Sequence, residues 1–501
     1  MSMYRLFIAA CLILTFSNIG FTQQPKAKRG GQEQNTKGKG RGGGGQAMGS
    51  AKKMNLDPIP NGNCVMGMPT DHSITASVVL EKGTEAYVEY STQSGEYKQR
   101  TSSFVAGAES PMEILIDNLS PNSQYFYRLK YKLPNSTAFI ATNESWFSTQ
   151  KKSGTSFSFG VQGDSHPERE GKMFHPLLYK QTLDSVAAYK PDFYFMMGDD
   201  FNIDRFLSNP SLNKSAIKGS YQLQRKYLGN MGANPPLFLV NGNHEQSAKY
   251  LLDGTDTNVA VIAGNARKKY FPLPAPDAFY SGDKDTVEHV GLLKDYYAFE
   301  WGNALFVVLD PYWHSDVAVD NQPGSQEKQG KKDQWKITIG DAQYNWLKTT
   351  LEKSKAKFKF VFAHHVMGTG RGGVERAPFF EWGGKSPNGT QQFGQYRPGW
   401  ALPIHQLMVK NKVTIFFQGH DHIYAQQSLD GVIYQSVPNP ADDTHTAFNK
   451  EAYTSGKILP NSGFLHVSVG QKEVKVEYVR SYFKQENLAQ ETTERHVYTV
   501  K

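Results

Sequence analysis

In five places along the 501-residue chain, a short apolar run is followed by residues of types that can bind metal ions. The first run, Ser156–Val161, is followed by Asp164 and His166. The residues that follow the other four runs are Asp199 and Asp200; Asn243, His244 and Glu245; His364 and His365; and His420, Asp421 and His422. Carboxylate, amide and imidazole groups in combination are typical metal ligands. One such ending alone is more often a turn or a hydrogen-bonded core residue, but five together favour a shared metal site.

Strands must position these residues. The alternating, aromatic-rich sequence of each run predicts a strand, and the glycines that follow mark the point where the chain leaves the sheet. In an open α/β sheet, the loops at the carboxyl ends of the strands converge on one crevice. The five groups can therefore reach a single site. A sixth run, ALFVVLD, ends at Asp310 without a neighbouring His or Asn, so we interpret Asp310 as structural.

Several further histidines follow none of these runs, and we interpret them as structural or exposed. They are His175, His289, His314, His405, His445 and His466. His314, in the sequence DPYWH after another predicted strand, is the first of them whose surroundings need inspection.

From about Thr155, predicted strands alternate with helical stretches, which is typical of a layered α/β domain. The clearest helical stretches are Lys180–Tyr189 and Asp341–Lys353. After about Ala447 the pattern returns to alternation, and Phe464–Val479 predicts a terminal hairpin that completes the sheet.

Residues 55–150 predict a small all-β sandwich. Alternating runs separated by turn-rich stretches cover Ser73–Leu80, Ala86–Tyr90, Glu113–Ile116, Tyr125–Tyr131 and Ser145–Ser148. The segment LSPNSQYFYRL, Leu119–Leu129, resembles the fibronectin type III pattern, with Tyr125 or Tyr127 as a corner tyrosine. We expect this domain to be a spacer or a module that shields the substrate.

Residues 1–22 predict a secretory signal peptide. Arg5 precedes the apolar run Leu6–Phe16, which is too short to span a bilayer, and small and polar residues follow it. We therefore expect an exported protein, periplasmic, secreted or at the cell surface, with no transmembrane segment in the mature chain. Cys11 lies in the middle of the apolar run, a poor position for lipidation. Cys64 is then the one remaining cysteine, so no intramolecular disulfide is expected.

Residues 23–54 predict a disordered linker that is rich in Gly, Gln and Lys. The linker carries a net charge of +7 of the formal +8, and Arg5 supplies the rest, so residues 55–501 are neutral overall. The net positive charge of the chain therefore gives no information about the folded part. We expect no specific nucleic-acid partner, and interpret the linker as a tether that associates weakly with anionic envelope polymers.

The order of the five groups resembles a known family. The series Asp-x-His, Gly-Asp, Gly-Asn-His-Glu, His and Gly-His-x-His is similar to that of the calcineurin-like metallophosphoesterase superfamily, and the β-domain in front resembles its purple acid phosphatase branch. Tyr296–Asp310 and Gln343–Leu347 are further likenesses. The resemblance implies a catalytic domain over residues 151–447, built as a four-layer sandwich of two mixed β-sheets flanked by helices. Residues 448–501 would be its C-terminal hairpin and tail.

The resemblance also implies roles for individual residues. Asp164, His166 and His422 would bind one metal ion, Asn243, His364 and His420 a second, and Asp199 would bridge the two. His244 would lie beside the leaving oxygen and donate a proton or stabilise charge. The ions would be two divalent or mixed-valence transition metals, with Fe, Mn and Zn all open. A metal-bound hydroxide would attack the phosphate ester in line, without a covalent enzyme intermediate.

The resemblance leaves some positions open. The ligand His of the family stands two residues before a Pro, but this chain has Val366 there, so the pattern selects His364 over His365 only weakly. Asp200, Glu245, His365 and Arg371 are expected behind the ligands or facing the substrate. Arg376 and Arg397, in the same Gly-rich segment as Arg371, are further candidates for a phosphate oxygen.

One departure concerns the metal. Purple acid phosphatases have a tyrosine three residues after the bridging Asp and a first group that resembles Asp-x-Gly. This chain has Asn202 in place of the tyrosine and keeps His166 in the first group. The retained imidazole can still complete the ligand set, so we expect no purple Fe(III) centre.

The leading interpretation is an exported, dinuclear-metal phosphatase that hydrolyses phosphomonoesters, similar to an acid phosphatase. A phosphodiesterase of the same superfamily is the first alternative, because the five groups do not distinguish the two activities. A monoester has a second negative charge and requires additional cations, whereas a diester requires room. A surface-binding protein without catalytic activity is the third possibility, but such a scaffold is expected to have lost at least one ligand.

Overall fold

The computed structural model describes residues 62–501 apart from 81, 83, 106, 109, 208–213, 230–234, 320–332, 367–369 and 485–487. The predicted signal peptide and basic linker lie outside the described residues. Within the described ranges, no helix has the length and apolar character needed to cross a membrane.

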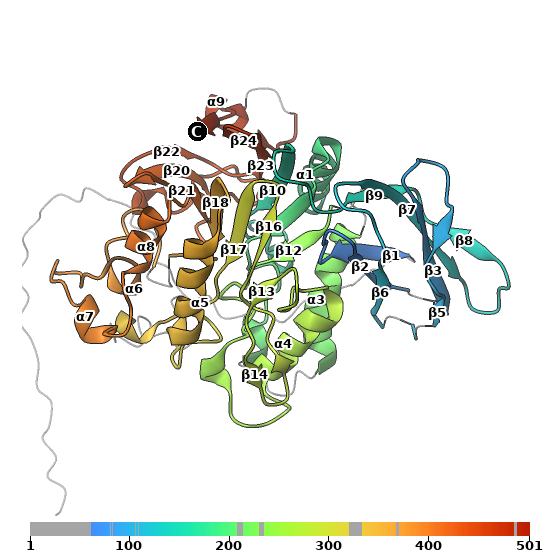
Figure 1. Cartoon of the computed structure of the whole chain (residues 1–501), viewed down its shortest axis with the longest axis horizontal. Helices are drawn as coiled ribbons and strands as arrows, with labels where there is room; N and C mark the ends of the chain where they lie inside the picture. Colours follow the sequence, from blue (N-terminus) through green and yellow to red (C-terminus); the bar gives the residue numbers. More distant parts are fainter. Residues whose placement is uncertain are drawn as a thin grey trace, which may run out of the picture. The chain divides into compact units, whose positions relative to one another are not determined.

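Two large mixed β-sheets form the centre of the molecule (Figure 1). The nine-stranded sheet has the order β25 (Val497–Val500), β24 (Val474–Arg480), β23 (Gly463–Val469), β10 (Phe157–Gln162), β11 (Phe193–Met196), β12 (Leu237–Leu239), β1 (Asn63–Gly67), β2 (Ile74–Val79), β6 (Met112–Ile116). The eight-stranded sheet has the order β13 (Ser281–Gly282), β16 (Tyr297–Trp301), β17 (Ala304–Val308), β18 (Phe358–Phe362), β19 (Ile415–Gln418), β21 (Val432–Ser436), β20 (Tyr424–Leu429), β22 (Lys457–Leu459). Strands β10, β11 and β12 are parallel, as are β17, β18, β19 and β21.

Aromatic side chains fill the space between the two sheets. The rings of Phe195 and Phe362, one from each sheet, stack with centroids 4.1 Å apart, and Phe159 meets Phe306 edge-on at 5.1 Å. Residues on the inner faces of both sheets belong to one buried cluster. Two sheets that pack face to face in this way have inward-pointing residues at alternate positions, which is the pattern of the predicted strands.

Helices cover the outer faces of both sheets. The helices α1 (Pro176–Tyr189), α3 (Lys214–Leu228) and α4 (Val259–Tyr270) pack on the nine-stranded sheet. The helices α5 (Gly340–Lys353), α6 (Phe380–Gly383) and α8 (Ile404–Lys410) pack on the eight-stranded sheet. The short helices α2 (Asp204–Leu207), α7 (Phe393–Tyr396) and α9 (Gln490–Thr493) and the two-stranded sheet of β14 (Thr286–Val287) and β15 (Gly291–Leu292) lie in connections. This confirms the predicted four-layer fold.

Residues 62–150 form a β-sandwich (Figure 1). Its second sheet has the order β4 (Gln99–Arg100), β3 (Glu85–Ser91), β7 (Gln124–Lys132), β8 (Phe139–Ala141), with β5 (Phe104–Val105) on β3 and β9 (Ser145–Ser148) on β7. The hydroxyl of Tyr125 accepts a hydrogen bond from the backbone N–H of Ser120 at 2.8 Å. That bond is the one expected of a corner tyrosine, and Tyr125 rather than Tyr127 makes it.

The first sheet of the sandwich, β1-β2-β6, is continuous with the nine-stranded sheet. Strand β1 runs parallel to β12, with Gly67 opposite Leu237. The predicted boundary at residue 150 lies between β9 and β10, and the division into domains stays a prediction. The C-terminal strands β23 and β24 form the predicted hairpin, and β23 pairs with β10.

Candidate metal centre

The predicted ligands meet where strands of both sheets end. Asp164 and His166 follow β10, Asp199 follows β11, Asn243 follows β12, His364 follows β18, and His420 and His422 follow β19. All seven are buried, with at most 5% of each residue exposed. Because these strands within each sheet are parallel, their carboxyl ends lie along one edge, and the two edges face each other across the site.

The glycines beside the ligands allow the loops to pack closely. A Cβ atom on Gly242 would stand 2.4 Å from Oδ1 of Asp199, and one on Gly419 would stand 2.5 Å from Oδ1 of Asp164. Side chains do not tolerate such separations, so these positions require glycine. The glycines that precede Asn243 and His420 in the sequence are therefore part of the site.

Several ligands have a left-handed backbone. The φ angles of His166, Asp199, His420 and His422 lie between 47° and 69°. That conformation costs non-glycine residues on the order of 1–3 kcal/mol each and is concentrated at functional sites. Asp421 faces away from the site and accepts a hydrogen bond from the Tyr453 hydroxyl at 2.6 Å. The alternating backbone thus lets two imidazoles enter the site from His420-Asp421-His422.

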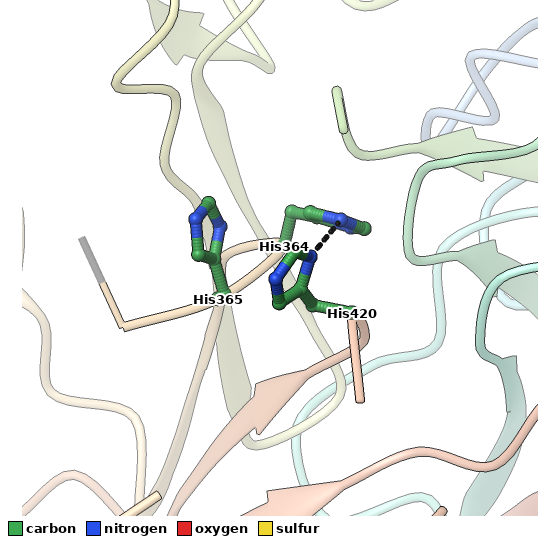
Figure 2. A group of neighbouring side chains, drawn as sticks. All are labelled: His364, His365 and His420. Carbon is green, nitrogen blue, oxygen red and sulfur yellow. Dashed lines mark hydrogen bonds between the residues drawn. The ribbon is translucent and has the colours of Figure 1, made fainter. Parts of the chain in front are cut away.

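Four possible ligand atoms converge at His364. Its Nδ1 donates to the backbone oxygen of Met197 at 2.8 Å, which leaves Nε2 facing the site. From Nε2, the Asn243 Oδ1 and Asp199 Oδ2 atoms are 3.0 and 3.1 Å away. The His420 Nδ1 atom is 3.2 Å away (Figure 2). Ligands held about 2.0–2.2 Å from one ion are themselves about 3 Å apart. The spacing therefore fits a metal ion.

The electrostatics of this position favour positive charge. Burial lowers the pKa of His364, but the charges of Asp199 and Asp164 outweigh burial and raise that pKa to about 10. The carboxylates thus draw a cation to this point, either a proton or a metal ion.

A second group of ligand atoms surrounds Asp164. Its Oδ1 accepts the backbone N–H of His420 at 2.8 Å, and its Oδ2 lies 3.1 Å from Nε2 of His422. His166 Nδ1 contacts Glu168 Oε1 at 3.0 Å, which orients the ring so that Nε2 faces the site. Among the described residues, Asp164 Oδ2 and His166 Nε2 are buried without a hydrogen-bond partner. Such atoms are suited to bind a cation.

Asp199 lies between the two groups. Its Oδ2 is 3.1 Å from His364 Nε2 and 3.8 Å from both His166 Nε2 and His244 Nε2. A carboxylate in this position can bridge two ions. The assignment of each ligand to one ion stays a prediction.

The geometry at His365 differs from that at His364. The His365 ring stacks on His420 with centroids 4.5 Å apart, and its Nδ1 contacts the Tyr312 hydroxyl at 3.2 Å. A nitrogen of His365 also lies within 4.8 Å of His364 and His420. Figure 2 shows the His365 ring beside the hydrogen-bonded pair of His364 and His420. Since Asn243 and Asp199 converge on His364, we favour His364 as the ligand and His365 as its support.

His244 has two partners that the sequence did not reveal. Its Nδ1 contacts Asp204 Oδ2 at 2.5 Å, and its Nε2 lies 3.0 Å from Nη2 of Arg169. Burial lowers the pKa of His244, but Asp199 and Asp204 outweigh burial and raise that pKa to about 9. Neither Asp204 nor Arg169 follows an apolar run, so the pattern that identified the ligands gave no signal for them.

Glu245 holds two ligand loops together. Its two carboxylate oxygens accept backbone N–H groups from Asp199, Asp200, Phe201 and Gly242, at 2.8–3.2 Å. These contacts place Glu245 behind the candidate ligands, where it supports two of their loops.

Asp200 and Arg371 also support loops of the site. The Asp200 Oδ1 atom accepts hydrogen bonds from Ser165 Oγ at 2.5 Å and Gln162 Nε2 at 3.0 Å. Arg371 Nη1 donates to the backbone oxygen of His420 at 2.8 Å and to Asp421 Oδ1 at 3.0 Å. These contacts favour support of the ligand loops over substrate binding for both residues.

The other candidate arginines face elsewhere. Arg376 donates to the backbone oxygen of Arg371. Arg397 pairs with Glu381 and lines a cavity of about 690 Å³, together with Trp335 and Trp400 and without a predicted metal ligand. Asp310 accepts backbone hydrogen bonds from Tyr312 and Trp313, in agreement with the structural interpretation.

The comparisons with known proteins agree with this geometry. Residues 157–424, more than half of the chain, match the family model of calcineurin-like phosphoesterases. Among solved structures, the chain is similar to PhoD, with 15% identity over 85% of this chain and 87% of that chain and a TM-score of 0.56, which shows the fold alone. A weaker likeness is to GAP50, the anchor in the inner membrane complex of Plasmodium. It has 12% identity over 65% of this chain and 84% of that chain, with a TM-score of 0.33. No curated protein matches the chain.

Proposed function

The chain belongs to the calcineurin-like phosphoesterase family, and we propose that it hydrolyses phosphomonoesters at a centre of two divalent transition-metal ions. The observation that carries the proposal is the position of Asp199 Oδ2, 3.1 Å from His364 Nε2 and 3.8 Å from His166 Nε2. One carboxylate oxygen thus adjoins a ligand atom of each group, as required for two ions that share a ligand. The apolar run Leu6–Phe16 supports export of the enzyme.

The ligands fit such a centre. Asp164, His166 and His422 would hold one ion, Asn243, His364 and His420 the other, and Asp199 both. When bound, Fe, Mn or Zn ions would neutralise phosphoryl oxygens and supply the activated water that attacks phosphorus. The mixture of carboxylate, amide and imidazole ligands suits these metals.

His244 would transfer a proton to the leaving oxygen. Asp204 accepts a hydrogen bond from Nδ1 of His244. That bond fixes the ring and leaves Nε2 as the atom that faces the substrate. With a pKa raised to about 9, the ring carries a proton on Nε2 at neutral pH. The leaving alkoxide then departs as an alcohol.

Arg169 supports monoester over diester specificity. Its Nη2 is 3.0 Å from Nε2 of His244, to which it can donate while that nitrogen is unprotonated, so the guanidinium and the imidazole border the same point. An anionic oxygen placed there would accept from both and relieve their repulsion. A monoester carries a second negative charge that a diester lacks, and Arg169, which also pairs with Glu168 at 3.2 Å, is a cation that can face it.

The test is the ratio of kcat/KM for p-nitrophenyl phosphate to that for bis(p-nitrophenyl) phosphate. We expect the wild-type chain to prefer the monoester, and Arg169→Gln to lose roughly 10²-fold on the monoester and much less on the diester, because charge-assisted bonds to phosphate weaken. Arg495→Gln removes an exposed arginine and should change neither value. Asn243→Ala should abolish both activities, which excludes a contaminant. A preference for the diester that Arg169→Gln leaves unchanged would establish a phosphodiesterase instead.

A further inference from the structure

A third buried cluster of ligand-type residues lies outside the catalytic centre. It consists of Asp283, Asp295 and His314, each of which offers one oxygen or nitrogen atom within 4.8 Å of the others. Asp283 directly follows β13, Asp295 lies two residues before β16, and His314 lies on the loop after β17. The cluster shares no residue with the groups that surround Asp199.

The cluster buries more negative charge than its hydrogen bonds neutralise. Both carboxylates are fully buried, and the His314 side chain is 10% exposed. Asp295 Oδ2 lies 2.8 Å from His314 Nε2, and Asp295 Oδ1 accepts the backbone N–H of Tyr296. Asp283 Oδ1 accepts the backbone N–H of Asp285, but Asp283 Oδ2 has no hydrogen-bond partner among the described residues.

No cationic side chain compensates for this charge at contact distance in the described part of the chain. Arg267 donates to the backbone oxygens of Lys294 and Leu239 instead. Lys249 pairs with Asp316. A buried carboxylate pair of this kind requires either a shared proton or a cation.

We propose that Asp283, Asp295 and His314 bind a divalent transition-metal ion, Zn²⁺ or Mn²⁺, separate from the catalytic pair. Two carboxylates and one imidazole suit these metals, whereas Ca²⁺ takes six to eight oxygen ligands and Mg²⁺ rarely takes an imidazole. The buried Asp283 Oδ2 atom, for which no hydrogen bond is formed among the described residues, supplies a ligand atom. Water would complete the coordination from the side where His314 is partly exposed.

The ion would connect three segments of the eight-stranded sheet. Asp283 and Asp295 lie at the two ends of the connection that carries β14 and β15, and the backbone N–H of Asp283 donates to the backbone oxygen of Tyr296 at 3.1 Å. Through His314, the ion would join these two ends to the loop that contains Tyr312. Tyr312 in turn contacts Nδ1 of His365, whose ring stacks on His420. The ion is thus a structural one that supports the wall of the catalytic centre, and its binding does not depend on the proposed reaction.

The test is the amount of Zn²⁺ bound by the full chain after saturation with Zn²⁺ and dialysis against metal-free buffer, measured by mass spectrometry of the metal. We expect Asp283→Asn and His314→Gln each to bind one equivalent fewer than the wild type. Asp192→Asn, which alters another buried carboxylate, beside Lys151, should bind as much as the wild type. Equal Zn²⁺ content in the wild type, Asp283→Asn and His314→Gln would overturn the proposal.

Thermal unfolding distinguishes a metal ion from a shared proton. An amide at position 283 can donate to Asp295, so a proton-sharing pair predicts that Asp283→Asn is at least as stable as the wild type with or without Zn²⁺. A metal site predicts instead that Zn²⁺ raises the Tm of the wild type more than that of Asp283→Asn. The same comparison in an Asn243→Ala background, with the catalytic centre impaired, should show the same difference. Its absence there would also contradict the proposal.

Discussion

His244 is subject to opposing influences that set its charge. Burial favours the neutral imidazole, while Asp199 and the hydrogen bond to Asp204 favour the imidazolium and raise the pKa to about 9. Bound metal ions would neutralise part of the Asp199 charge, so the contribution of Asp204 becomes the more important one. In its proposed role as the acid, His244 would act only while protonated.

This predicts the alkaline side of the pH profile. Because the acid must be protonated, kcat/KM should fall as the pH rises through the pKa of His244, at or below about 9. Asp204→Asn removes an interaction that raises this pKa, so the fall should move to lower pH by about 1–2 units, since a hydrogen bond to a charged group contributes about 1.5–3 kcal/mol. The measurement is kcat/KM for p-nitrophenyl phosphate from pH 5 to 10. An unchanged alkaline limb in Asp204→Asn would show that His244 is not the acid.

At the scale of elements, the turns after the strands decide whether ligands from separate strands can meet. Strand β19 ends at Gln418, and Gly419 then passes so close to Asp164 that a Cβ atom would stand 2.5 Å from its Oδ1. The φ angle of Gly419 is not in the left-handed region, so the constraint there is contact rather than backbone conformation. Displacement of this turn would move Asp164. It would also move the backbone N–H of His420, which donates a hydrogen bond to Asp164 Oδ1.

Gly419→Ala should therefore impair the centre without unfolding the chain. We expect at least a 10²-fold loss of kcat/KM and weaker retention of metal, because a displacement of about 1 Å of a ligand loop has effects of this size. Gly394→Ala adds the same methyl group where no atom lies within 4 Å, and should leave both properties unchanged. Equal activity of the two variants would mean that the turn has room that the structure does not suggest.

At the scale of the whole molecule, the β-sandwich and the catalytic sheets share their hydrogen bonds. The guanidinium of Arg225, on α3, is fully buried and donates to the backbone oxygens of Asn63, Ser77 and Tyr270. Burial lowers the pKa of Arg225 to about 10, so the group stays charged at neutral pH. Through this residue and the pairing of β1 with β12, the sandwich is joined to the layer that bears β10, β11 and β12.

This predicts one cooperative unfolding transition for the sandwich and the catalytic layers. Arg225→Gln should lower the free energy of unfolding by about 3 kcal/mol or more, because several buried carbonyls lose a charged donor. Arg100→Gln, an exposed arginine of the sandwich, should have little effect. Urea unfolding followed by fluorescence and by circular dichroism measures both. Two separate transitions in the wild type would show that the sandwich folds independently.

The sequence by itself determined the layers and selected the candidate ligands. A glycine and a ligand directly after an apolar strand form a local pattern, and it identified Asp164, Asp199 and His420 without any knowledge of the fold. Likewise the alternation of Tyr125–Tyr131 and the helical stretch of Asp341–Lys353 correspond to β7 and α5. Local patterns persist in the structure because strand and helix periods are set by neighbouring residues.

The tertiary structure decided which residues surround those ligands. His364 and His365 are adjacent in sequence, and the hydrogen bond from His364 Nδ1 to Met197, 167 residues away, distinguishes them. Arg169 and Asp204 reach His244 from separate segments, and neither carries a local signature. Asp283 and Asp295 meet His314 only because the pairing of β13 with β16 brings their strand ends together. Such contacts depend on the packing of distant segments, which no short stretch of sequence encodes.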